Sequence, residues 1–118
     1  MKRGELYLVR KPSSHDTRKE DPRKQRVFVI ASRQTLVDSR HSSAICAPVY
    51  TSHGSLDSQV LVGPDEGLKK ESSIHCDELV SVQKSQLTHY IGALSPQRLL
   101  EFDRALSVAL GLDRGLFE

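Results

Sequence analysis

The strongest strand signal in this chain is Arg26-Val27-Phe28-Val29-Ile30-Ala31-Ser32. Residues 27–31 are all apolar and do not alternate with polar residues, and β-branched and aromatic side chains of this kind favour strands. A strand that is apolar on both faces has to be covered on both faces. We therefore predict a central strand here, with the other elements arranged around it.

Weaker strand patterns flank this stretch on both sides. Before it, Glu5 to Arg10 reads as a first strand, and after it Ser43 to Thr51 places Ile45, Ala47 and Val49 on one face. Further strands are predicted at residues 59–62, 73–76, 78–82 and 89–94, with a turn at 52–55 and a loop at 65–68.

The C-terminal part of the chain carries the signals of a helix. Ser95 is a suitable N-cap, Pro96 suits the first helical position, and Gly111 is a natural stop. Many short strands and one terminal helix predict a small, strongly bent sheet or barrel with a helix packed on it. The apolar stripe of the helix is expected to comprise Leu99, Phe102, Leu106 and Ala109, widened by Leu100, Ala105 and Leu110.

The segment from Lys11 to Gln25 is polar, contains two prolines and lacks apolar periodicity. We expect a long exposed loop there, and loops of this length on compact domains tend to be functional or disordered. Between Arg10 and Arg26 the chain has seven basic and three acidic residues, although its total formal charge is only +2. Such a stretch attracts phosphates. A solvated loop of mixed charge is the alternative.

Length and composition limit the class of protein. With 118 residues, of which 37% are hydrophobic, the chain suffices for one domain (residues 1–118) with one core. No run approaches the roughly 20 apolar residues of a membrane-spanning helix, and no secretory signal is recognisable, so we expect a cytoplasmic protein without membrane contact. Cys46 and Cys76 form no CxxC pair, and their apolar surroundings predict reduced core thiols.

No metal, cofactor or nucleotide site is predicted. The five histidines (residues 15, 41, 53, 75 and 89) are scattered, and the run His75-Cys76-Asp77 lacks a spaced set of further ligands. The glycines match neither a Walker nor a dinucleotide-binding pattern. His53 follows Tyr50-Thr51-Ser52 and could approach a phosphate; an ordinary loop histidine is the alternative.

Five segments in this order resemble the MazF/PemK/Kid family of toxins, over about residues 2–112. Residues 2–7 (KRGELY) resemble its opening RGE-[IL]-[WY] strand, and residues 26–32 (RVFVIAS) its RP-x-[LV]-V-[IV]-S strand. Residues 46–52 (CAPVYTS) and 73–79 (SIHCDEL) resemble its V-[AP]-x-[IV]-T-S and S-x-[IV]-x-[CA]-[DE]-Q-[IV] segments. Residues 91–96 (IGALSP), with the helix after them, resemble its tail.

The resemblance implies an SH3-like β-barrel with helices, the plasmid-toxin fold that also includes CcdB, and a homodimer. It implies metal-independent, sequence-specific cleavage of single-stranded RNA, which inhibits translation. It also implies an antitoxin of the MazE kind that lays a disordered acidic tail along the same groove. Operator DNA would be bound only through the complex with the antitoxin.

Cleavage of RNA without a metal requires charge stabilisation at the phosphorane and proton transfers at the 2′- and 5′-oxygens. The guanidinium of Arg26 can hold two phosphate oxygens, and the resemblance makes Arg26 the catalytic residue, with an electrostatic role favoured over an acid role. From spacing alone, a strand-end arginine that reaches into solvent is the alternative. The family threonine aligns with Tyr50 if no residue is inserted, or otherwise with Thr51, whose hydroxyl we take as the second catalytic group.

Further residues are expected to bind RNA. Tyr50 could stack on a base, and Asp77 and Glu78 could accept hydrogen bonds from base amino groups. A half-buried strand aromatic and a solvated acidic pair are the alternatives. The predicted RNA-binding set is Arg18, Lys19, Arg23, Lys24, Tyr50, Ser52, His53, Asp77 and Glu78.

Two other classes of function stay open on sequence grounds. One is a non-enzymatic gyrase inhibitor of the CcdB type, on the same fold. CcdB uses a C-terminal tryptophan to engage gyrase, and the absence of tryptophan from this chain counts against that class. The other is a module that binds single-stranded nucleic acid without cutting it.

Overall fold

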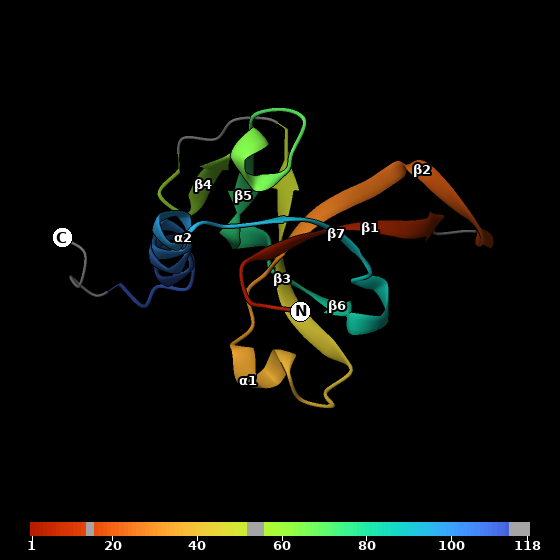
Figure 1. Ribbon diagram of the computed structural model, residues 1–118, viewed down its shortest axis with the longest axis horizontal. Coiled ribbons are helices and arrows are strands. Elements are labelled where there is room, and N and C mark those ends of the chain that lie inside the picture. The colour runs from red at the N-terminus through yellow and green to blue at the C-terminus, as the bar shows by residue number, and fades with distance from the viewer. Residues whose placement is uncertain (14–15, 52–55, 114–118) are drawn as a thin grey trace.

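The computed structural model describes residues 1–13, 16–51 and 56–113, and for residues 11–24 it describes the backbone only. The described chain forms an antiparallel sheet that bends strongly, with the C-terminal helix at one end of the molecule (Figure 1). The sheet order is β4-β5-β3-β2-β1-β7, and β6 also pairs with β3. Among the described helices, none combines the length and the hydropathy that crossing a lipid bilayer requires.

The predicted central strand is confirmed as the inner half of β2 (Asp16–Ile30). It pairs with β1 (Glu5–Ser13) on one side and with β3 (Ser43–Tyr50) on the other. Val29 faces one hydrophobic cluster, whereas Phe28 and Ile30 face a second cluster on the opposite side of the sheet. Both faces are therefore covered, as the unbroken apolar run requires.

The expectation of a long loop at residues 11–25 is wrong. β1 and β2 continue as a paired two-stranded ribbon that reaches away from the end of the molecule carrying α2 (Figure 1). Its register includes Arg10 opposite Gln25 and Pro12 opposite Glu20, with irregularities on both sides of Pro12. Alternation of apolar and polar residues identifies strands that have one buried face. This ribbon is held by backbone hydrogen bonds between its two strands, and its polar sequence gives no such pattern.

The remaining strands lie near the predicted positions. β4 has the predicted bounds, β5 and β6 begin within two residues of theirs, and β7 ends one residue early. Short helical pieces that the sequence did not suggest connect them: the helix α1 (Gln34–Val37) and the 3₁₀ turns η1 (Pro64–Glu66), η2 (Cys76–Glu78) and η3 (Lys84–Gln86). The predicted turn at 52–55 lies outside the described residues. The strand bounds are β4 Gln59–Val62, β5 Ser72–His75, β6 Val80–Gln83 and β7 His89–Ala93.

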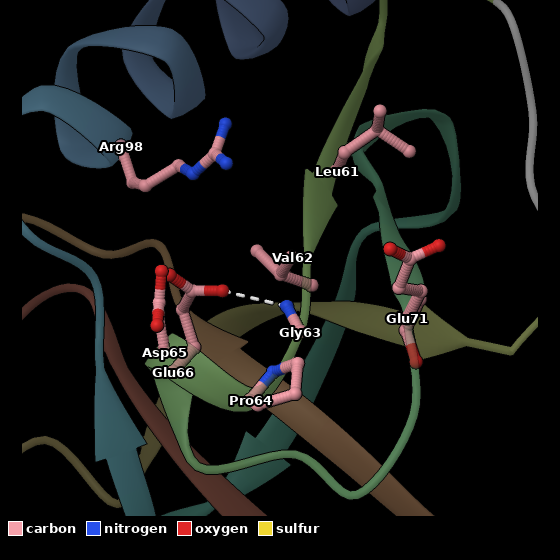
Figure 2. Close-up of a pocket in the computed structure, with 9 residues that line it drawn as sticks. Leu61, Val62, Gly63, Pro64, Asp65, Glu66, Glu71 and Arg98 are labelled. Carbon is pink, nitrogen blue, oxygen red and sulfur yellow. Dashed lines mark hydrogen bonds between the residues drawn. The ribbon is translucent and has the colours of Figure 1, made fainter.

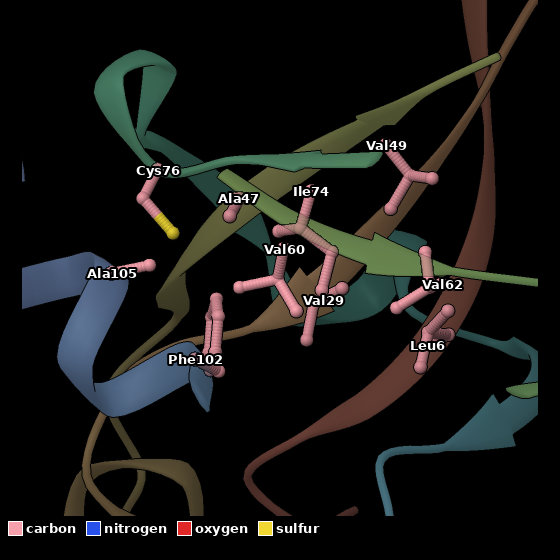
Figure 3. Packing of buried hydrophobic residues seen from close by; sticks show 10 residues of the cluster. All are labelled: Leu6, Val29, Ala47, Val49, Val60, Val62, Ile74, Cys76, Phe102 and Ala105. Atoms are coloured by element: carbon pink, nitrogen blue, oxygen red, sulfur yellow. The ribbon is translucent and has the colours of Figure 1, made fainter. Parts of the chain in front are cut away.

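The predicted C-terminal helix is confirmed as α2 (Pro96–Ala109). The Ser95 hydroxyl accepts a hydrogen bond of 3.1 Å from the Arg98 backbone N–H, as an N-cap should. Phe102 and Ala105 enter the first cluster from the helix and meet side chains of the sheet (Figure 3). The predicted stripe was too wide, however, because Leu100 and Leu110 are exposed.

Strand β3 packs on both clusters, which the sequence analysis missed. Ala47 and Val49 belong to the first cluster, as predicted, but Ile45 on the same face is exposed near the start of the strand. On the other face, Ala44 and Cys46 belong to the second cluster. Both cysteines are buried and free, so the prediction of core thiols is confirmed; Cys76 belongs to the first cluster.

Arg3 ties the start of the chain to α2. Its Nη1 lies 2.8 Å from the Asp103 carboxylate, its guanidinium lies over the Phe102 ring, and its Nε donates to the Ala31 carbonyl. The end of β2 and the helix are thereby joined through one side chain.

Candidate nucleic-acid interface

Arg26 lies where the second cluster reaches the surface. It points to the same side of β2 as Phe28, because residues two apart on a strand share a face. Its guanidinium carbon lies 4.2 Å from the centre of the Tyr50 ring, at the end of the adjacent strand β3. Its Nη1 also donates a long hydrogen bond of 3.5 Å to the Val49 carbonyl. These contacts hold the charged group over the ring.

The hydroxyl of Tyr50 is held in turn by Glu78. It donates a hydrogen bond of 3.0 Å to Glu78 Oε1. Burial is the main cause that raises the pKa of Tyr50, and the hydrogen bond and charge of Glu78 act in the same direction, against the lowering effect of Arg26. The hydroxyl therefore keeps its proton and remains a hydrogen-bond donor.

His75 joins this group from the end of β5. Its ring meets the Tyr50 ring edge-on, with the two centres 4.6 Å apart. Its Nδ1 lies 3.4 Å from Glu78 Oε2, and its Nε2 lies 2.8 Å from the hydroxyl of the buried Ser73. Arg26, Tyr50, Glu78 and His75 thus form one connected group, drawn from β2, β3, η2 and β5.

Two hollows lie on either side of Arg26. The first, of about 320 Å³, lies on the face of β2 that carries the Arg26 side chain, and Tyr50 and Glu78 line it. The second, of about 520 Å³, is lined by Arg26, Thr51 and the loop that follows η1. Each is large enough for a nucleotide-sized ligand.

The two candidates for the family threonine position separate in the structure. Tyr50 contacts the Arg26 guanidinium, whereas Thr51 is exposed and lines the second hollow. Tyr50 is thus the residue that meets Arg26. One face of its ring is already covered by the guanidinium, so the predicted stacking of a base on Tyr50 would use the ring together with Arg26.

The other predicted site residues are placed as follows. Asp77 and Glu78 are both exposed, and Asp77 accepts a hydrogen bond from the Ser58 hydroxyl at the entrance to β4. Ser52 and His53 lie outside the described residues. Arg18, Lys19, Arg23 and Lys24 lie on β2, but their side chains are not among those described.

Sequence reasoning missed three residues around Arg26. The sequence analysis treats His75 only as a possible metal ligand, but residues two apart on one strand share a face, so His75 and Ser73 lie on the same face of β5. Lys69 and Lys70 line the second hollow. The signal for them is a pair of adjacent lysines outside the basic stretch at residues 10–26.

A third recess, of about 380 Å³, lies between η1 and the start of α2. Figure 2 shows the Arg98 side chain reaching toward it from the helix, opposite Asp65 and Glu66. Glu71 also lines it, so its described lining residues carry three carboxylates and one guanidinium. An excess of acidic groups repels phosphates, and the recess is therefore a poor place for nucleic acid.

The described part of this interface was compared with what a metal site requires. Among the described residues, no group of three or more His, Cys, Asp or Glu side chains is placed so that it could hold a metal ion. The Arg26 group instead offers a fixed guanidinium and a protonated phenol, which suits an anion.

The sequence and fold of the chain match a known family. The model of the family described as PemK-like, MazF-like toxin of type II toxin-antitoxin system matches residues 2–110. The chain belongs to this family. The resemblance read from the five segments is thereby confirmed.

A curated member of the MazF group shares part of the sequence. A probable endoribonuclease MazF of Mycolicibacterium smegmatis is 41% identical over 49 residues, which cover 42% of this chain. The match spans 45% of that relative, less than half its length.

Solved structures of MazF proteins share the fold. The toxin MazF-mt6 of Mycobacterium tuberculosis has a TM-score of 0.75 at 21% identity, covering 92% of this chain and 98% of that one. A MazE–MazF structure from Deinococcus radiodurans has a TM-score of 0.74 at 14% identity and covers 95% of this chain and 96% of that one. An endoribonuclease in complex with its cognate antitoxin, from a mycobacterial species, has a TM-score of 0.74 at 21% identity, with coverages of 93% and 94%. The predicted plasmid-toxin fold is confirmed: an antiparallel β half-barrel with a C-terminal helix.

Proposed function

We propose that this MazF-like protein is a metal-independent, sequence-specific endoribonuclease that cuts single-stranded RNA and so inhibits translation. The observation that carries the proposal is the Arg26 guanidinium held over the Tyr50 ring between two hollows. The family membership and the names of the related proteins point to the same activity.

The reaction fits these groups in the following way. The 2′-oxygen attacks the adjacent phosphorus as its proton passes to water, and the bond from phosphorus to the 5′-oxygen breaks as that oxygen takes a proton from water, giving a 2′,3′-cyclic phosphate and a 5′-hydroxyl. Arg26 would stabilise the negative charge that builds on the non-bridging oxygens. The Tyr50 hydroxyl, once its single hydrogen turns from Glu78, or the hydroxyl of Thr51 would donate a hydrogen bond to one of them.

The test uses a long single-stranded RNA in EDTA, with the cut ends mapped by primer extension. Arg26→Ala is compared with the wild type and with Arg33→Ala, which removes an exposed arginine from the start of α1. Discrete cuts by the wild type and Arg33→Ala, and none by Arg26→Ala, support the proposal and reveal the sequence motif. Equal cutting by Arg26→Ala removes Arg26 from the mechanism. If no folded variant cuts, the gyrase inhibitor or the binding module becomes the better reading.

We also propose two protein partners. One is a second copy of the chain, and the other is an antitoxin whose acidic tail competes with RNA for the hollows beside Arg26. The relatives solved as MazE–MazF and with a cognate antitoxin support the second partner. Light scattering that gives the 13.2 kDa of one chain would contradict the homodimer.

A further inference from the structure

The second hollow is basic, with an apolar floor. Its described lining residues include Arg26, Lys69 and Lys70, and there is no acidic residue among the described lining residues. Its remaining polar side chains are Gln25, Thr51 and Ser72, and its apolar ones are Leu8, Val27, Val49, Leu68 and Ile91. The charge is thus opposite in sign to that of the recess beside η1, which has more carboxylates than cations. An apolar floor with cations at its border suits a nucleotide, whose base is apolar on its faces and whose phosphate is charged.

The loop that carries the two lysines is fixed at its base. A Cβ on Gly67 would lie 2.3 Å from the Ile91 carbonyl oxygen, and one on Gly92 would lie 2.1 Å from the Glu66 carbonyl oxygen. The backbones of η1 and β7 therefore touch, with Gly67 at φ +91°. Glycine alone allows both the approach and the conformation.

Side chains anchor the same loop on either side of the lysines. Glu66 is buried and accepts a hydrogen bond of 2.6 Å from the Gly63 backbone N–H (Figure 2). Leu68 packs against the first hydrophobic cluster. The Ser72 hydroxyl donates a hydrogen bond of 3.0 Å to the Lys70 carbonyl. A loop held in this way presents its cations in one place, which lowers the entropy lost when a ligand binds.

We propose that Lys69 and Lys70 form a phosphate-binding site for the stretch of RNA next to the one at Arg26. This inference rests on the proposed function, because it assumes that the RNA crosses Arg26. The lysines line the hollow on the face of β2 opposite to the Arg26 side chain, and Arg26 and Thr51 also line that hollow, so a strand with one phosphate at the Arg26 guanidinium would reach them by continuing past Thr51. They act in binding and position, not in the chemical step.

The test measures the salt dependence of RNA binding in proteins that cannot cut. A short fluorescein-labelled single-stranded RNA of mixed sequence is titrated with Arg26→Ala, and with Arg26→Ala combined with Lys69→Ala and Lys70→Ala. A matched control combines Arg26→Ala with Lys2→Ala and Arg40→Ala, two exposed cations outside the hollows. Each lost phosphate contact lowers the slope of log K against log salt by about 0.7 for a single strand. We therefore expect the loss of both lysines to lower the slope by about 0.7 to 1.4 relative to the Arg26→Ala parent. The control variant should keep the slope of that parent.

A second measurement separates binding from chemistry. In the cutting background, Lys69→Ala/Lys70→Ala should raise KM and leave kcat within about twofold, since an interaction made equally in the ground and transition states affects only KM. Lys69→Arg/Lys70→Arg should restore the wild-type KM. The inference is overturned if replacing both lysines by alanine leaves the slope and KM unchanged. That holds even if the same replacement weakens binding of an acidic peptide. If the wild type makes no cuts but the slope still falls, the phosphate site stands and the nuclease proposal fails.

Discussion

The guanidinium carbon of Arg26 lies 4.2 Å from the centre of the Tyr50 ring, and the Tyr50 hydroxyl is bonded to Glu78. A tyrosine in this place does two separable things. Its ring fixes the guanidinium through a cation–π contact, which is worth roughly 0.5 to 2 kcal/mol. Its hydroxyl, whose pKa is raised by burial and by Glu78, keeps its proton beside the cation and would turn from Glu78 to donate to a phosphate.

The hydroxyl of Tyr50 can be tested without disturbing its ring. Tyr50→Phe keeps the contact with Arg26, whereas Thr51→Val removes the hydroxyl in the second hollow. We expect Tyr50→Phe to lower the single-turnover rate of RNA cleavage by about 10² to 10³, the usual loss when a donor to developing charge is removed. A larger loss in Thr51→Val than in Tyr50→Phe would instead assign the family threonine position to Thr51.

Glu78 was predicted from sequence to bind RNA, but its place beside Arg26 leads us to expect that its carboxylate instead weakens RNA binding. It stands in the first hollow, beside Arg26, where it repels phosphates. Glu78→Gln keeps an acceptor for the Tyr50 hydroxyl and removes the charge, so we expect KM for RNA to fall several-fold at low salt, and the gain to shrink as salt screens the charges. Asp65→Asn, in the acidic recess beside η1, is the matched control and should leave KM unchanged. A rise in KM for Glu78→Gln would show that its charge helps to bind RNA.

Phe102 should be the largest contributor of α2 to stability. It is fully buried in the first cluster, whereas Leu100 on the same helix is 71% exposed. Removing a buried aromatic side chain leaves a cavity, so Phe102→Ala should lower the free energy of unfolding by about 3 to 5 kcal/mol. Leu100→Ala should change it by no more than about 0.5 kcal/mol. Urea denaturation measures both, and similar values for the two variants would contradict this packing.

Any side chain at Gly92 should destabilise the fold, because the backbones of η1 and β7 are in contact there. A Cβ there would lie 2.1 Å from the Glu66 carbonyl oxygen, but one at Gly63 would meet nothing closer than 3.8 Å. Gly92→Ala should therefore lower the free energy of unfolding by about 1 to 3 kcal/mol, the usual cost of overpacking. Gly63→Ala, the control, should stay near the wild type in the same urea titrations. An unaltered midpoint for Gly92→Ala would mean that the two backbones do not touch.

Alkaline pH should destabilise the fold through buried groups that hold their protons. Burial raises the pKa of Cys46 and of Cys76 from 9.0 to about 12, and burial with the Glu5 hydrogen bond raises the pKa of Tyr7 from 10.0 to about 12. The folded chain then binds more protons than the unfolded chain between these values. The stabilisation is complete below pH 9 and is lost as pH rises toward 12.

Urea midpoints measured at rising pH under reducing conditions check this expectation. Tyr7→Phe isolates one of the three groups, and its midpoint should fall less steeply above pH 10 than that of the wild type. Parallel curves for the two proteins would show that the Tyr7 hydroxyl does not titrate differently in the folded and unfolded states.

Local sequence predicted those elements whose signals are local. Residues 27–31 are apolar throughout, and that run needs a strand covered on both faces wherever it lies. Ser95, Pro96 and the spacing of Leu99, Phe102 and Leu106 mark a helix and its buried side within a few turns of chain. The order of the five family segments is likewise visible in the sequence alone, and it is the basis for the prediction that Arg26 is catalytic.

Which side chains meet depends on long-range contacts that appear only in the folded chain. Whether Tyr50 or Thr51 faces Arg26 depends on the register of β2 against β3, since a shift of one residue turns every side chain to the other face. The ribbon at residues 11–25 depends on pairing between two strands, and its polar sequence contains no pattern that predicts this pairing. Lys69 and Lys70 reach the hollow beside Arg26 because two glycines let distant backbones touch. Contacts between residues far apart in the chain create these features, and no local pattern encodes them.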